Sequence, residues 1–378
     1  MSVAPRLYFD HNATSPLRPE AREALVTALD MKGNASSVHD EGRSARRLIE
    51  DAREKVAALV GARPSEVVFT SGASEANNWA LGCGWSRVFH TPVEHESVLA
   101  AVHASGAHRS EIPVAASGEI EREEFEEKVF SSGDPKGTIA TLQIANNETG
   151  VIQDVARAAE FARGHGVAMH TDAVQACGRL TVDFAALDVD LMSVSSHKIG
   201  GPMGVGALVV RDGFALAPML VGGGQERRRR AGTENVAAIA GFGAAAEIAA
   251  GEVTREAERL RRFRERLEQE ILSIVPEAVL IGAGTRRLPN TTCVALVGER
   301  AETVLIKLDL AGVAVSSGSA CSSGKVGRSH VLEAMKIDTD LAGSAIRISV
   351  GWDTDEMALE DFISRFRRLF EQKRRAVA

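Results

Sequence analysis

Short apolar, β-branched runs alternate with amphipathic stretches along the first two-thirds of the chain. The runs predict strands at residues 66–70, 87–91, 138–144, 167–170, 191–195 and 205–210. The stretches between them predict helices, among them residues 45–60, 96–104 and 155–163. Strands that alternate with helices usually pair in parallel, so the pattern predicts a large α/β domain with a mostly parallel sheet flanked by helices. Such sheets bind ligands at the carboxyl ends of their strands.

The pattern changes near residue 250, where a small apolar stretch, 237–250, gives way to the heavily charged stretch 252–270. Beyond it, residues 291–297 and 345–350 predict strands, and residues 302–310 and 356–375 predict helices. This order is typical of a smaller α+β domain. We therefore expect a large domain over residues 15–250 and a small domain formed by residues 1–14 and 251–378.

The composition argues against several classes of protein, among them nucleic-acid-binding and disulfide-rich proteins. The 378 residues are 44% hydrophobic and carry a formal net charge of −7, which argues against general attraction to nucleic acid or anionic membranes. The run Arg227–Arg230 lies between glycine-rich segments, which favours a structured loop. The four cysteines form no CxxC pair, so a zinc site or a disulfide framework is not expected. With neither a signal-peptide pattern nor an apolar run near 20 residues, the sequence predicts a cytoplasmic protein.

Lys198 and Asp172 carry the first chemical signal. Lys198 follows the strand 191–195 and opens into Gly200-Gly201. A lysine partly buried at a strand end can become a neutral amine that forms a Schiff base with a carbonyl cofactor, although a surface lysine in a turn remains the alternative. Asp172 ends the preceding strand, and pyridoxal phosphate requires an acid beside its pyridinium nitrogen. The two residues in this order favour a pyridoxal phosphate site over a turn or a helix cap.

Further polar residues follow the predicted strands. Thr70-Ser71-Gly72-Ala73-Ser74 leads from a strand into a helix, whose amide groups and hydroxyls could bind a phosphate or form an ordinary cap. Ser195 and His197 could add donors. His95 could stack on a flat ring and move protons, or be structural. Asn147 follows another strand and could form a turn or contact a ligand.

Two residues in the last third of the chain also stand out. Arg347 places a charge inside a β-branched strand, where it could bind a substrate carboxylate or form a structural salt bridge. Cys321 lies in Ser316-Ser317-Gly318-Ser319-Ala320-Cys321-Ser322-Ser323-Gly324, a segment too small and polar to form a core. This setting predicts an exposed, reactive thiol.

With these residues assembled, the chain resembles the cysteine desulfurases of the NifS/IscS type, within class V of the pyridoxal-phosphate-dependent aminotransferase fold. The resemblance extends from Tyr8-Phe9-Asp10-His11-Asn12-Ala13-Thr14 to Arg347-Ile348-Ser349, and includes Arg230-Ala231-Gly232-Thr233-Glu234-Asn235. It implies conversion of L-cysteine to L-alanine, with sulfur transferred to Cys321 as a persulfide for iron–sulfur cluster assembly or another acceptor protein.

The resemblance also implies a role for each candidate residue. Lys198 would form the Schiff base, Asp172 would pair with the pyridinium nitrogen, and Gln175 with the phenolic oxygen. His95 would stack on the ring and shuttle protons. The other implied cofactor and substrate contacts are Ala73, Ser74, Ser195 and His197 for the phosphate, Thr233 for the phosphate of the second subunit of a homodimer, and Asn147 and Arg347 for the substrate carboxylate.

Other functions remain as alternatives. A selenocysteine lyase would share the site, and a class V aminotransferase would not need Cys321. A scaffold protein without turnover is disfavoured because Lys198 and Asp172 are both present. A nucleic-acid binder is disfavoured by the net charge.

Overall fold

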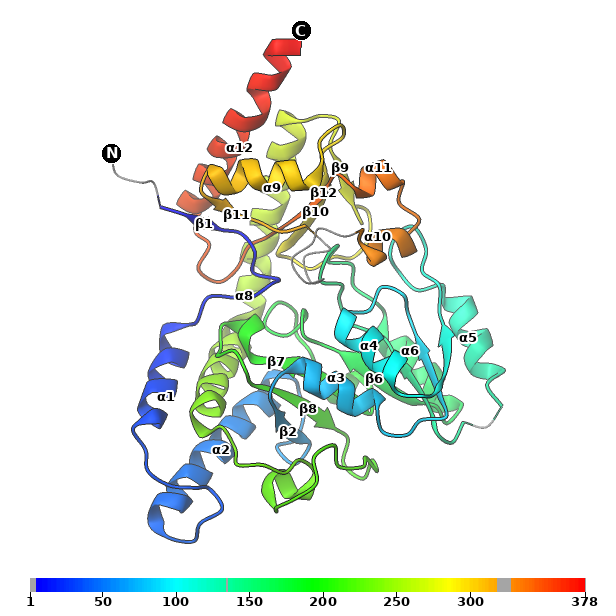
Figure 1. Ribbon diagram of the computed structural model, residues 1–378, viewed down its shortest axis with the longest axis vertical. Helices are drawn as coiled ribbons and strands as arrows, with labels where there is room; N and C mark the ends of the chain where they lie inside the picture. The colour runs from blue at the N-terminus through cyan, green and yellow to red at the C-terminus, as the bar shows by residue number, and fades with distance from the viewer. Residues whose placement is uncertain (1–4, 134, 318–327, 378) are drawn as a thin grey trace.

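A seven-stranded sheet forms the larger part of the molecule, shown in Figure 1. The structure, a computed structural model, describes residues 5–133, 135–317 and 328–377. The strand order is β2-β8-β7-β6-β5-β3-β4. The strands are β2 (Val67–Thr70), β3 (Arg87–His90), β4 (His108–Glu111), β5 (Thr138–Thr141), β6 (Ala168–Asp172), β7 (Leu191–Ser195) and β8 (Gly206–Val210).

The prediction of a mostly parallel sheet is confirmed, and β8 is the exception. Strand β8 runs antiparallel to both β7 and β2, whereas β7, β6, β5, β3 and β4 pair in parallel. The connection from β7 to β8, residues 196–205, holds one 3₁₀ turn and glycines. A parallel crossover needs a dozen or more residues, usually with a helix, so this short connection reverses the chain.

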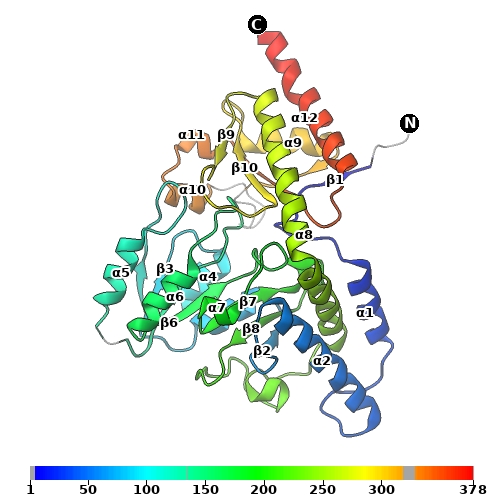
Figure 2. The same ribbon diagram turned by 180° about the vertical axis from the view of Figure 1, so that it is seen from behind.

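Helices cover both faces of the sheet (Figures 1 and 2). One face packs on α2 (Asp40–Leu59), α6 (Val155–Gly164) and the first half of α8 (Val236–Ile274), and the other packs on α3 (Ala73–Leu81) and α4 (Glu96–Ala104). Successive residues of β2 alternate accordingly, since Phe69 joins the first core and Val68 joins the second. The remaining helices of this part are α1 (Pro19–Leu29), α5 (Arg122–Phe130) and α7 (Phe184–Leu187).

The smaller part contains a three-stranded antiparallel sheet of β9 (Val279–Ile281), β10 (Thr291–Ala295) and β12 (Ala345–Ser349), in the order β12-β10-β9. Near the chain start, β1 (Leu7–Tyr8) pairs in parallel with β11 (Val313–Ala314). The helices of this part are α9 (Ala301–Leu310), α10 (His330–Ala334), α11 (Thr339–Ala342) and α12 (Glu356–Val377). Phe9 packs against Phe362 in the core of this part, with ring centroids 4.7 Å apart and the ring planes tilted by 31°.

Helix α8 joins the two parts, and Figure 2 shows it running from one to the other. Phe242 in its first half lies in the core beneath the large sheet, and Phe263 in its second half lies in the core of the smaller part. By length and composition α8 could cross a membrane, but burial of its apolar side chains against the core accounts for that composition. The expected domain boundary at residue 250 falls inside this continuous helix, and the division into residues 15–250 and residues 1–14 with 251–378 stays a prediction.

Candidate active site

A cavity of about 510 Å³ opens at the carboxyl ends of the parallel strands. Its walls come from the segments that follow β2, β3, β5, β6 and β7, and from the turn that enters β8. Nine of the predicted site residues line it: Ala73, Ser74, His95, Asn147, Asp172, Gln175, Ser195, His197 and Lys198. A larger cavity of about 770 Å³ lies beside α9, α10 and α11, and none of these nine residues lines it.

Of the predicted site residues that the structure describes, two do not line the cavity. Arg347 is buried on β12, where it donates a 2.7 Å hydrogen bond to Oδ1 of Asp10 and a 3.0 Å bond to the carbonyl of Asn147. It is therefore one residue removed from the cavity wall. Thr233 is exposed at the surface. Cys321 lies outside the described residues.

The carboxylate of Asp172 ends β6 and accepts a hydrogen bond on each oxygen. The backbone N–H of Val174 donates to Oδ1 and the Asn77 side-chain amide donates to Oδ2, both at 2.9 Å. Asn77 was not predicted as a site residue. The sequence feature that could have identified Asn77 is a polar residue on the apolar face of the predicted helix, next to Ala76 and near Ala80. Two neutral donors keep this carboxylate oriented towards the cavity.

Lys198 lies in the 3₁₀ turn Ser196–Ile199 after β7. Its Nζ donates to the backbone carbonyls of Asn12, at 2.5 Å, and Ala13, at 2.8 Å. The neighbouring His197 places Nδ1 3.1 Å from Oγ1 of Thr14, and burial lowers the pKa of His197 to about 4. His197 is therefore neutral near pH 7 and can act as a hydrogen-bond donor or acceptor.

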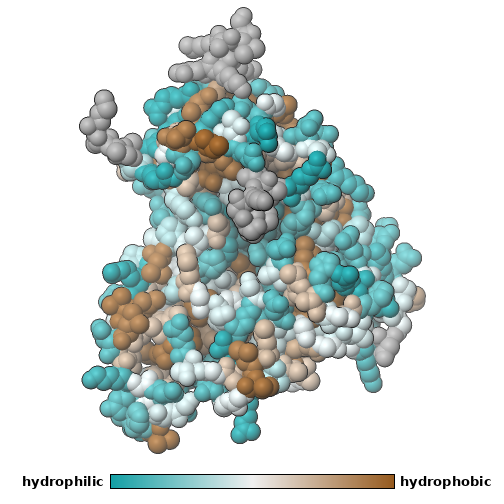
Figure 3. Space-filling model, viewed as in Figure 1, coloured by the Kyte–Doolittle hydropathy of each residue, from teal (hydrophilic) through white to brown (hydrophobic). Residues whose placement is uncertain are grey.

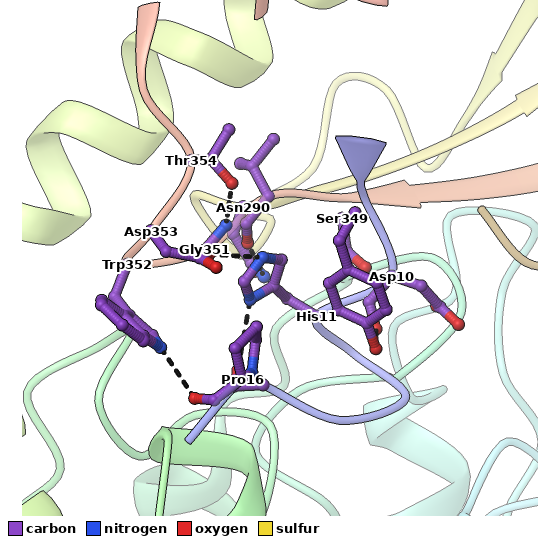
Figure 4. A network of polar contacts seen from close by, with 12 residues as sticks. Asp10, His11, Pro16, Asn290, Ser349, Gly351, Trp352, Asp353 and Thr354 are labelled. Atoms are coloured by element: carbon purple, nitrogen blue, oxygen red, sulfur yellow. Dashed lines mark hydrogen bonds and ion pairs between the residues drawn. The ribbon is translucent and has the colours of Figure 1, made fainter. Parts of the chain in front are cut away.

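The segment Asp10–Pro16 is a second feature that residue-type reasoning did not assign to the site. Asn12 contacts several site elements: its carbonyl accepts from Gln175 at 3.0 Å, and its amide donates to the carbonyl of Asn147 at 3.1 Å. Figure 4 shows the same segment fixed from the other side, with His11 Nε2 3.1 Å from Asp353 and Trp352 donating to the Pro16 carbonyl. Asp10–Pro16 therefore links the end of β12 to the floor of the cavity.

The N-terminus of α3 provides an anion-binding arrangement. Its cap residue, Gly72, forms no side-chain cap, and the first helical residues, Ala73 and Ser74, line the cavity. Unpaired N–H groups and the helix dipole favour an anion here. The backbone of Gly72 also packs closely against β8, because a Cβ at Gly206 would lie 2.8 Å from the Gly72 backbone. Three groups around this cavity fit the three reactive parts of pyridoxal phosphate. Lys198 fits its carbonyl, the acid Asp172 fits its ring nitrogen, and the N-terminus of α3 fits its phosphate.

Besides His197, two further groups beside the cavity, Glu94 and His95, have perturbed pKa values. Burial raises the pKa of Glu94 to about 8, and the charge of Asp172 adds to this effect. Burial lowers the pKa of His95, against the opposing attraction of Asp172. Perturbed groups of this kind concentrate at functional sites.

Fold and cavity together define an α/β enzyme with its site at the carboxyl edge of a mostly parallel sheet. The chain belongs to the aminotransferase class-V family, whose model matches residues 7–362.

Curated relatives match over nearly their whole length. The chain is 41% identical to an IscS-like cysteine desulfurase of Mycobacterium tuberculosis, covering 91% of each chain. It is also 41% identical to a cysteine desulfurase of Cereibacter sphaeroides, covering 92% of each. Among solved structures, a NifS-like protein from Rickettsia africae superposes with a TM-score of 0.90 at 33% identity, covering 97% of this chain and 99% of that one.

Proposed function

We propose that this protein is a pyridoxal-phosphate-dependent cysteine desulfurase. It converts L-cysteine to L-alanine and takes the sulfur onto Cys321 as a persulfide. The observation that carries the proposal is the meeting of Lys198, Asp172 and the uncapped N-terminus of α3 around one cavity. Full-length relatives named as cysteine desulfurases support the same activity, as does a solved structure titled SspA in complex with cysteine, 31% identical with a TM-score of 0.78.

Pyridoxal phosphate, when bound, supplies a carbonyl for attachment and a ring that withdraws electrons from the substrate. In this proposal Lys198 holds the carbonyl carbon, and Asp172 keeps the ring nitrogen protonated. His95 would cover the ring and Gln175 would bind its phenolic oxygen. The residues that would bind the phosphate are Ala73 and Ser74 through their amides, Ser195 through its hydroxyl and His197 through its ring, and Asn147 would lie beside the cofactor.

Arg347 and Asn147 are proposed to bind the substrate carboxylate. In the structure one Arg347 nitrogen is paired with Asp10, while Nε is buried and has no hydrogen-bond partner among the described residues. A buried guanidinium N–H without an acceptor is unfavourable, so a carboxylate that reached it would be bound by a charge-assisted bond. The pair with Asp10 keeps Arg347 in place before substrate arrives.

In this proposal Lys198 transfers protons and Cys321 accepts the sulfur. The Nζ of Lys198, which lies at the cavity, would remove the α-proton of the substrate and return a proton to the product. The thiolate of Cys321 attacks the substrate sulfur: a sulfur–sulfur bond forms, the carbon–sulfur bond breaks, and its electron pair remains with the carbon that becomes alanine. A thiol reductant then releases the outer sulfur as sulfide.

The proposal extends to partners and location. The exposed Thr233 would contact the phosphate in the second subunit of a homodimer, which would explain why it lies away from the cavity of its own chain. The persulfide would pass to a sulfur-acceptor protein, such as an iron–sulfur scaffold, in the cytoplasm.

The direct test is incubation of the purified protein with L-cysteine and a thiol reductant, followed by measurement of sulfide and alanine. We expect equal amounts of both. Cys321→Ser should keep the visible absorption of the bound cofactor and lose sulfide release, and Lys198→Ala should lose that absorption. Desulfuration of cysteine by Cys321→Ser at the parent rate would refute the proposal. Preferential turnover of selenocysteine would favour a selenocysteine lyase instead.

A further inference from the structure

A chain of short hydrogen bonds connects Asp172 to His95. The amide nitrogen of Asn77 lies 2.9 Å from Oδ2 of Asp172 and 2.9 Å from Oγ of Ser97. Oγ of Ser97 in turn lies 2.8 Å from Nδ1 of His95. His95 and Ser97 begin α4, Asn77 lies on α3, and Asp172 ends β6, so three elements meet here.

The orientation of the Asn77 amide follows from Asp172. A carboxylate only accepts hydrogen bonds, so the group facing it must be the amide NH₂ and not the amide oxygen. The second hydrogen of the same NH₂ is then donated to Ser97. This leaves Oδ1 of Asn77 buried and without a partner among the described residues. A buried acceptor without a donor costs free energy, so the two bonds that the NH₂ group donates must outweigh that cost.

The direction of the next bond follows from the first. Because Oγ of Ser97 accepts from Asn77, its own hydrogen is available for Nδ1 of His95. The backbone N–H of Ser97 also donates to Nδ1, at 3.1 Å, because His95 is the N-cap of α4. A ring nitrogen that faces two donors carries no proton, so the proton of the neutral ring is on Nε2.

Charges around His95 are consistent with a neutral ring. Burial lowers the pKa of His95, and Lys198 and His330 act in the same direction. Asp172 and Glu96 oppose them without reversing the shift.

We propose that Asn77 and Ser97 are positioning residues that hold His95 as the neutral tautomer protonated on Nε2. His95 then offers the cavity a hydrogen-bond donor, suited to an anionic sulfur or oxygen of the substrate, and Nε2 does not act as a base. The inference rests on the proposed function for the identity of the reaction, whereas the tautomer is a property of the folded protein.

The test is nitrogen NMR of the full-length protein labelled with ¹⁵N-histidine, as purified and after removal of bound cofactor. The His95 signals are assigned by their loss in His95→Gln. At pH 7 we expect a protonated Nε2 and an unprotonated Nδ1. Ser97→Ala removes the hydroxyl donor but keeps the backbone N–H on Nδ1, and Asn77→Ala frees the Ser97 hydroxyl to accept from Nδ1. Each variant should therefore raise the population of the second tautomer above that of the parent, whereas Ser97→Thr, which keeps the hydroxyl, should keep the parent spectrum.

Asn78→Ala is the matched control, because Asn78 is the neighbouring asparagine on α3 but is exposed, and its side-chain amide donates to the Ser74 carbonyl in its own helix. It should leave the His95 signals unchanged. A protonated Nδ1 in the parent at pH 7 would overturn the inference even if the variants failed to fold. Parent-like spectra in both Ser97→Ala and Asn77→Ala would overturn it as well. Absence of desulfurase activity would refute the proposed function alone, since these spectra do not depend on turnover.

Discussion

Glu94 precedes His95, and its side chain is fully buried beside the candidate site. Oε1 accepts hydrogen bonds from Thr91 Oγ1 and from the Gln143 backbone N–H, both at 3.0 Å. Oε2 has no hydrogen-bond partner in the described part of the chain. With a pKa raised to about 8 by burial, this carboxyl is protonated at neutral pH and supports the wall of the cavity as a neutral acid.

The charge state of Glu94 gives a prediction about stability and pH. Glutamate in the unfolded chain titrates near 4.5, whereas folded Glu94 keeps its proton up to about pH 8. The folded state therefore binds more protons in this window, and the stabilising contribution falls as pH rises from 4.5 to 8. Glu94→Gln mimics the protonated acid, so its melting temperature should depend less on pH and exceed that of the parent at pH 9.

Circular dichroism at pH 5, 7 and 9 measures this difference. Glu160→Gln, an exposed residue on α6, serves as the control and should follow the parent at all three values. Identical pH profiles for Glu94→Gln and the parent would show that Glu94 does not hold a proton in the folded state.

Sequence reasoning at the residue scale left Arg347 with two roles, a structural ion pair or a carboxylate site. The structure shows the ion pair with Asp10, which lies 337 positions away in the chain, together with a buried Nε that has no partner among the described residues. Neither the ion pair nor the unpartnered Nε could be predicted from the sequence, because a strand pattern indicates which positions are buried but not which distant group faces them.

At the element scale, α8 approaches α2 closely. A Cβ at Gly243 would lie 2.6 Å from Cα of Ala52, on the α2 backbone, which no side-chain rotation can relieve. A Cβ at Gly251, in the same helix, would meet no atom within 4 Å, and this glycine is exposed. The two glycines therefore have different reasons to be glycine.

Alanine at these two positions should have opposite effects. Gly243→Ala should force α2 and α8 apart and destabilise the protein by about 1–3 kcal/mol. Gly251→Ala should stabilise it by about 0.5–1 kcal/mol, because alanine is the better helix former. Urea unfolding of both variants measures the difference, and equal stability of the two would contradict the close helix contact.

A second element is fixed by a buried ion pair. Three consecutive residues, Glu226, Arg227 and Arg228, adopt left-handed backbone conformations with φ of 44°, 57° and 66°. The Glu226 carboxylate nevertheless reaches the core, where it accepts two hydrogen bonds from Arg53, at 2.7 and 2.9 Å, and one from the Phe69 backbone. The expectation that the arginine run belongs to a structured loop agrees with this anchor.

Removing the charge of Glu226 should be strongly destabilising. Glu226→Gln removes the buried carboxylate from Arg53 and leaves it paired only with the half-exposed Glu50 among the described residues, a loss of about 3–5 kcal/mol. Glu50, the other carboxylate beside Arg53, is 46% exposed, so Glu50→Gln should change stability by less than about 1 kcal/mol. Unfolding in denaturant compares the two, and a small effect of Glu226→Gln would remove the ion pair as the anchor of this loop.

At the scale of the whole molecule, the surface leaves apolar side chains exposed. They include Met203, which lines the cavity, and the sequence neighbours Met219, Leu220 and Val221, of which Val221 is 85% exposed. Hydrophobic side chains also gather over α1 on the face shown in Figure 3. Apolar groups grouped in this way are typical of surfaces that become covered.

The proposed homodimer predicts that these side chains are covered in solution. Light scattering after size-exclusion chromatography should give twice the chain mass at micromolar concentration. Val221→Asp should shift the equilibrium towards monomer because a charge would be buried, while Ile306→Asp, 61% exposed on α9, should not. A monomeric parent protein would contradict the role proposed for Thr233.

The sequence alone determined the local elements and the chemistry at their ends. Most predicted strands and helices agree with the structure to within a few residues, since hydrophobic periodicity is a property of neighbouring positions. Lys198 and Asp172 could be found because Asp172 ends one strand and Lys198 lies in the turn after the next, and the carboxyl ends of parallel strands share one edge of the sheet.

Tertiary structure decided which distant polar groups meet. Lys198 donates hydrogen bonds to the carbonyls of Asn12 and Ala13. Asn77 donates to both Asp172 and Ser97, and Arg347 donates to Asp10. These contacts join residues whose spacing in the chain follows no period. They form because buried donors and acceptors must be paired once packing has excluded water, and the fold alone determines which partners are within reach.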